Sequence, residues 1–72
     1  MTASKLKVGE IGVIKELDFE NKIQRHRMMD LGFIPDVKIK CLTKTFGTTA
    51  FEVKGSKYGV RNEDAEQIKL KQ

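Results

Sequence analysis

The chain has 72 residues, of which 39% are hydrophobic, one is proline and one is cysteine, and its formal net charge is +4. This length allows one domain with a modest core, and the hydrophobic content favours a folded domain over a disordered tail. A single cysteine excludes an internal disulfide, and we find no membrane span or secretory signal. We therefore expect a soluble, cytoplasmic protein in a reducing compartment.

The first predicted strand covers residues 10–17 and follows a loose N-terminus at residues 1–5. Ile11 and Val13 point to one side of this strand, with polar residues and glycine between them. The spacing from Ile14 onward breaks the alternation, so we expect a bulge near that residue. A bulge of this kind helps a short sheet to bend.

A short helix is predicted over residues 22–31, with Asn21 as its N-cap and Gln24 as the partner in a capping box. Gly32 can adopt positive φ just past a helix, and Pro35 favours a turn. The chain should therefore turn sharply from this helix into the next strand.

At helical spacing, the expected core-facing residues of this helix are Ile23, Met28 and Leu31. Met29 should lie on the other side, next to Arg25 and His26, where the core does not explain it. Flexible methionines are common on adaptable protein-binding surfaces. Phe33 and Phe46 are further candidates for exposed apolar surface, although Phe33 could instead pack back on the helix as the hydrophobic partner of the glycine stop.

The remaining sequence predicts more strands. A second strand over residues 37–43 and a loop over residues 44–47 precede a hairpin of residues 48–54 and 57–61. Gly55 and Ser56 are the expected two-residue type II′ turn. The resulting register pairs Val53 with Tyr58 and Phe51 with Val60.

A single helical turn at residues 62–66 and a last strand around residues 68–71 complete the chain. The fold class is therefore mostly β: a small, strongly bent barrel of about five antiparallel strands. One α-helix follows the first strand and caps one opening of the barrel. The single helical turn precedes the last strand.

The net charge is uneven, because residues 1–36 have six basic and six acidic side chains and residues 37–72 have eight and four. A basic half can bind nucleic acid or an acidic partner, or it can simply keep strand surfaces solvated. The lysines are scattered, without arginine clusters or aromatic stacking platforms, so the solvated interpretation is favoured.

No combination of residues suits catalysis, so we expect no enzyme and no cofactor. His26 and Asp30 are four residues apart and are weak candidates for metal ligands, because a stable site needs three or four. Cys41 falls on the apolar side of its strand and should be a buried small hydrophobe. The acids within residues 63–66 are explained by the start of a helix.

The chain resembles the FeoA-type ferrous iron transport protein A family over nearly its whole length. Residues 6–14 are similar to the leucine, glycine, glycine and isoleucine pattern of the family. Residues 27–35 resemble its most specific motif, an Arg-Leu pair followed by Leu-Gly and a proline, with Met28 in place of leucine. Residues 58–61 with the later Ala65 and Ile68 resemble its closing segment. Asp36 stands where the family usually has glycine. Aspartate also tolerates the geometry of a turn, so the turn can be kept.

The resemblance implies an SH3-like barrel similar to the C-terminal domain of iron-dependent repressors. It also implies an accessory protein that contacts the cytosolic part of FeoB, the membrane GTPase permease for ferrous iron. Contact with the membrane would then be indirect, through this partner at the inner face of the plasma membrane. No binding of nucleic acid is expected, and the chain would be a monomer or a weak homo-oligomer. The partner-binding residues that we predict are Arg25, His26, Met29 and Phe33. The alternatives are a nucleic-acid-binding module and a ferrous-iron-sensing domain that uses His26, Asp30 or the acidic turn of residues 63–66.

Overall fold

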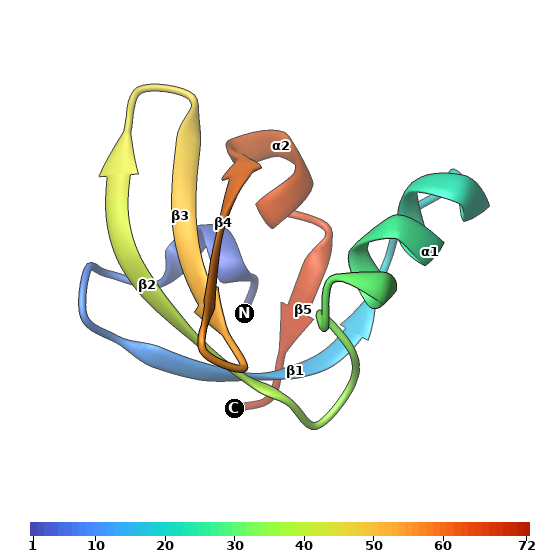
Figure 1. Cartoon of the computed structure of the whole chain (residues 1–72), viewed down its shortest axis with the longest axis horizontal. Coiled ribbons are helices and arrows are strands. Elements are labelled where there is room, and N and C mark those ends of the chain that lie inside the picture. The colour runs from blue at the N-terminus through green and yellow to red at the C-terminus, as the bar shows by residue number, and fades with distance from the viewer.

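Five antiparallel strands form one bent sheet in the computed structural model, which describes residues 1–72 (Figure 1). The elements in chain order are η1 (Ala3–Lys5), β1 (Ile11–Leu17), α1 (Lys22–Asp30), β2 (Lys38–Thr45), β3 (Thr48–Val53), β4 (Ser56–Arg61), α2 (Asn62–Ala65) and β5 (Ile68–Leu70). The strands are hydrogen-bonded in the order β4-β3-β2-β1-β5. The mostly-β class, the five strands and the place of both helices are therefore as the sequence predicts.

The core lies on the inner side of the bent sheet. Phe33 and Phe51 meet edge to face with ring centroids 6.4 Å apart, and Tyr58 lies against Phe33 at 5.9 Å. Such edge contacts add to the stabilisation that burial of the rings supplies. The largest fully buried side chains are Phe33, Phe51, Ile14, Ile39, Ile68, Val53 and Cys41. The burial of Cys41 confirms the sequence prediction.

The bulge expected in β1 is present, because the pairing of β1 with β5 shifts register between Ile14 and Glu16. Ile14 is fully buried, whereas Ile11 is exposed to solvent. A Cβ on Gly12 would lie 2.8 Å from Cδ1 of Leu70, so glycine lets Leu70 of β5 approach the backbone of β1. The inward side of β1 is therefore that of Gly12 and Ile14.

The N-terminus is not loose, which corrects the prediction for residues 1–5. Thr2 forms a β-bridge with Lys69, and the Leu70 backbone N–H donates to the Met1 carbonyl at 2.8 Å. Ala3 is fully buried in η1. Because β5 has a free edge on this side, the first residues satisfy backbone groups that would otherwise be unpaired.

The hairpin of β3 and β4 is confirmed, but its predicted turn and register are wrong. The turn residues are Lys54 and Gly55, with φ of 50° and 83°, as a type I′ turn requires. The observed pairs are Val53 with Ser56, Phe51 with Tyr58 and Thr49 with Val60. The register differs from the predicted one by two residues, so every side chain keeps its predicted face.

The second strand is longer than predicted, because β2 continues to Thr45 and leaves only Phe46 and Gly47 as a tight turn before β3. The expected loop over residues 44–47 is thus mostly strand. A register shift between Cys41 and Thr43 interrupts the alternation, which explains why the end of this strand was not recognised.

Helix α1 begins as predicted. The Asn21 side-chain Oδ1 accepts hydrogen bonds from the backbone N–H groups of Ile23 and Gln24 at 2.9 and 3.1 Å. The Gln24 side chain does not return to Asn21 as a capping box would require. Its Nε2 donates instead to Oδ1 of Asp64 at 2.8 Å, which ties α1 to α2.

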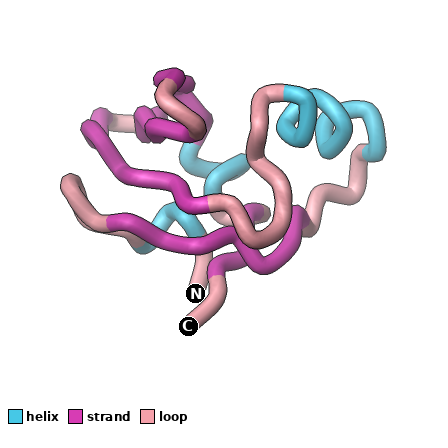
Figure 2. Tube along the Cα trace, turned by 60° about the horizontal axis from the view of Figure 1, so that its bottom comes forward, coloured by secondary structure: helices cyan, strands magenta, loops and turns pink.

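The end of α1 is a Schellman motif. Gly32 has φ of 110°, its N–H donates to the Met29 carbonyl at 2.9 Å, and the Phe33 N–H donates to the Met28 carbonyl at 3.0 Å. Both Met28 and Phe33 belong to the core. The helix does not cap an opening of the barrel, because it lies to one side of the strands in Figures 1 and 2.

Candidate functional site

Most of the apolar surface of α1 is exposed. Ile23 and Leu31 are 70% and 40% exposed, so the expectation that both face the core is wrong. Met29 is 39% exposed, as predicted, and Met28 is the one buried residue of the helix. The reason is that α1 meets the core only through its last turn, where Met28 and Phe33 enter it.

A groove of about 450 Å³ lies between α1 and the end of β1. Its lining residues are Glu16, Leu17, Arg25, His26, Met29, Asp30 and Pro35. Met29 and Leu17 supply its apolar part, while Arg25 and Asp30 place opposite charges at the same site. A concave surface with apolar and charged groups suits the binding of a partner side chain.

The groove includes three of the four residues that the sequence predicted for partner binding, namely Arg25, His26 and Met29. Phe33 does not join them, and this prediction is wrong. Its side chain is fully buried against Phe51 and Tyr58. Phe33 instead packs back on the helix, which is the alternative that the sequence analysis gave. The cause is its place directly after the Schellman glycine, where an apolar residue commonly contacts the last turn of the helix.

The sequence did not indicate Glu16, Leu17 and Pro35 as part of this site. They reach α1 because the bulge and the turn before β2 bring the end of β1 and the helix together, and no local pattern reports that distance. The exposure of Ile23 was also missed, because helical periodicity cannot tell which face a neighbour will cover.

His26 and Asp30, the weak metal-ligand candidates, both line the groove. The structure contains no group of three or more His, Cys, Asp or Glu residues placed to hold a metal ion. Asp64 of α2 accepts the Gln24 hydrogen bond and lies 3.8 Å from Nε of Arg61. Asp64 therefore has a structural role, because it links α2 to α1 and lies near Arg61.

Two other features bear on function. Phe46, in the turn between β2 and β3, is fully exposed, as the sequence suggested. None of the helices has the length and apolar composition needed to cross a bilayer.

Comparison with known proteins adds to this description. The family model described as FeoA domain matches residues 1–72. No protein among the curated ones matches the sequence. Several solved structures match the fold, and they confirm the expected SH3-like barrel.

A FeoA protein from Chlorobium tepidum is 25% identical with a TM-score of 0.85, and the match covers 97% of this chain and 68% of that one. FeoA of Stenotrophomonas maltophilia is 18% identical with a TM-score of 0.88, over 99% of this chain and 89% of that one. That protein is described as a zinc complex, an SH3 domain protein and a candidate activating factor of bacterial ferrous iron transport. IdeR of T. acidophilum is 20% identical with a TM-score of 0.86, and the match covers 97% of this chain but 32% of IdeR.

Proposed function

The chain belongs to the FeoA domain family, and from this premise we propose that it is a non-catalytic accessory protein of bacterial ferrous iron uptake. It acts by binding the cytosolic part of the FeoB permease through α1 and the groove beside it. The protein works in the cytoplasm and reaches the inner face of the plasma membrane through this partner.

The observation on which the proposal rests is the unpartnered apolar surface of α1. Ile23, Met29 and Leu31 are all at least 39% exposed, whereas the fifteen residues of the core are at most 9% exposed. Met29 lines the groove, and Ile23 and Leu31 lie outside it. Exposed apolar side chains beside charged ones are typical of a protein-binding site. Arg25 and Asp30 in the same groove would fix the orientation of the partner, since opposite charges select complementary groups.

The test is a titration of isotope-labelled chain with the cytosolic domain of the permease, followed by NMR in each nucleotide state of that domain. We expect shifts for Ile23, Met29 and Leu31. Met29→Ser should lower the affinity by about tenfold, because it removes an apolar side chain from a buried contact.

The matched control is Val8→Ser, since Val8 is also exposed and apolar but lies outside the groove. It should leave the affinity unchanged. Equal losses for Val8→Ser and Met29→Ser, or an absence of shifts in every nucleotide state, would contradict the proposal.

Iron sensing through the same groove is the second candidate, favoured by the presence of both His26 and Asp30 in its lining. It predicts stoichiometric binding of ferrous iron under anaerobic conditions, lost in His26→Ala. Two protein ligands are fewer than a stable site needs, so the adaptor function is the stronger proposal.

A further inference from the structure

The outward face of β2, β3 and β4 is strongly basic. Side chains alternate along a strand, so residues between buried ones point away from the core. On this outward face Lys40 of β2 lies opposite Glu52 of β3, which in turn lies opposite Lys57 of β4. Lys38 precedes on the same side of β2, and Lys54 adds a charge in the turn. Glu52 is the only acidic residue in these three strands.

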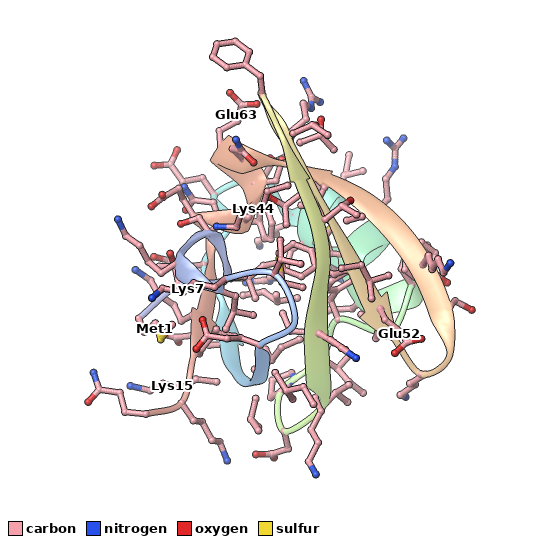
Figure 3. The ribbon with its side chains drawn as sticks, turned by 90° about the vertical axis from the view of Figure 1, so that its left-hand side faces the viewer. Met1, Lys7, Lys15, Lys44, Glu52 and Glu63 are labelled. Atoms are coloured by element: carbon pink, nitrogen blue, oxygen red, sulfur yellow. The ribbon has the colours of Figure 1, made fainter.

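None of the lysines of this face forms an ion pair, although Glu52 lies between Lys40 and Lys57. The ion pairs of the structure are Arg61 with Asp64, Lys69 with Asp18 and Lys71 with Asp36. Lys44 also lies elsewhere, since it is on the opposite side of β2 from Glu52 in Figure 3 and donates to the Ser4 carbonyl. The outward face of β2, β3 and β4 therefore keeps a net positive charge that the chain itself does not neutralise.

Apolar groups accompany this charge. A shallow depression of about 140 Å³ is lined by Lys38, Lys40 and Lys54, by the single acidic residue Glu52, and by Ile11, whose side chain is 60% exposed. At the far end of β2, Phe46 is fully exposed in the turn to β3. A fully exposed phenylalanine makes no contribution to the core, so its ring is free to contact another molecule or a membrane.

The chemistry of the face favours one kind of partner. Recognition of single-stranded nucleic acid uses aromatic stacking platforms, but Phe51 and Tyr58 of these strands pack against Phe33 in the core. Separated lysines with long apolar stems lie toward the start of β2, and an exposed phenylalanine follows its other end. Spread along one hairpin in this way, they match a surface that is anionic outside and apolar beneath. The headgroup region of an acidic bilayer has this structure.

We propose that the outward face of β2, β3 and β4, with Phe46 at the end of its hairpin, binds membranes that contain anionic phospholipid. The lysines face the lipid phosphates, and the Phe46 ring enters the boundary between headgroups and acyl chains. Helix α1 lies on the other side of the molecule from the turn that holds Phe46 in Figures 1 and 2, and only the Lys54 end of the face comes near the end of α1, at Gly32. The proposal does not depend on the identity of any protein partner.

The experiment is co-sedimentation of the full chain with vesicles of phosphatidylcholine alone and of phosphatidylcholine with phosphatidylglycerol. We expect binding only to the anionic vesicles, decreasing as salt is raised to roughly physiological strength. Each lysine near an anionic surface is worth about 1 kcal/mol, so Lys38→Glu with Lys40→Glu should reduce partitioning roughly 20-fold or more. Phe46→Ser should reduce it by about tenfold.

The matched control is Lys5→Glu with Lys22→Glu, which makes the same change in net charge at exposed positions outside this face. It should reduce binding much less. Equal losses in both double variants would show a general charge effect and overturn the proposal. Absence of binding to anionic vesicles at low salt would also overturn it and would make a protein pocket the better partner for Phe46. Far-ultraviolet circular dichroism checks that each variant is folded.

Discussion

The barrel and α1 use their apolar residues in opposite ways. In β3, Phe51 and Val53 alternate with exposed or half-buried residues, and both are buried. In α1, Met28 alone is buried, while Ile23 and Met29 remain exposed. The barrel is thus stabilised by its own core, whereas α1 is stabilised mainly by the groups that begin and end it. This difference leaves the surface of α1 available to another molecule.

The largest loss of stability is expected for a substitution at Phe33, where the barrel and α1 meet. Phe33→Ala should destabilise the protein by about 3–5 kcal/mol, because it removes a fully buried ring and leaves a cavity against Phe51. Urea denaturation followed by circular dichroism measures this change. The matched control is Phe46→Ala, the same substitution at a fully exposed site, which should change stability by less than about 0.5 kcal/mol. Similar losses of stability in Phe33→Ala and Phe46→Ala would contradict the view that burial of Phe33 stabilises the barrel.

The next effect concerns the glycine that ends α1. Gly32 has φ of 110°, and a Cβ there would lie 3.2 Å from Cγ1 of Val53. Gly32→Ala should therefore cost about 1–2 kcal/mol of stability. Gly59→Ala is the control, since Gly59 lacks positive φ and its nearest contact would be an ordinary 3.5 Å. A neutral Gly32→Ala would mean that the Schellman turn does not hold the helix to the barrel.

A substitution at the N-cap of α1 tests the stability of the helix separately from that of the barrel. Asn21→Ala removes both hydrogen bonds from Oδ1 and should destabilise the helix by about 1 kcal/mol. Amide hydrogen exchange should become faster in α1 and stay unchanged in β3, because the barrel does not depend on the helix. Asn21→Ser, which keeps a capping oxygen, should restore most of the protection. Faster exchange throughout the sheet would instead show that helix and barrel unfold together.

The smallest effect is expected in the turn from α1 to β2. Asp36 has φ of 74°, and the Val37 N–H donates to the Ile34 carbonyl across the turn. Asp36→Gly should relieve this left-handed conformation and stabilise the protein by about 0.5–1 kcal/mol. The exposed ion pair of Asp36 with Lys71 is lost, at a cost that Lys71→Ala measures separately. Thermal unfolding of both variants tests the sign, and a net loss in Asp36→Gly beyond that of Lys71→Ala would contradict it.

Local signals in the sequence were sufficient for most of the fold. Asn21, Gly32 and Pro35 mark the helix and its exit because each has a conformational preference that acts within a few residues. The turn at Lys54 and Gly55 was misplaced by one residue because glycine is compatible with either central position, and lysine seldom adopts positive φ.

The candidate site was only partly predictable. The place of Met29 on the helix follows from helical geometry, so its exposure could be foreseen. The other wall of the groove, with Glu16 and Leu17, depends on how β1 bends, which is a tertiary property. The pairing of Thr2 with Lys69 was missed for the same reason, because it joins residues at opposite ends of the chain.

That last pairing has a consequence for the connectivity of the fold. The first and last residues lie side by side, with the Met1 carbonyl bonded to the Leu70 N–H at 2.8 Å (Figure 1). A short linker from Gln72 to Met1 would join them at small entropic cost, and a new opening between Phe46 and Gly47 would give a circular permutant that begins with β3. We expect every strand pair to survive this rearrangement, which would show that the sheet depends on which strands are neighbours in space and not on the order in which they are translated.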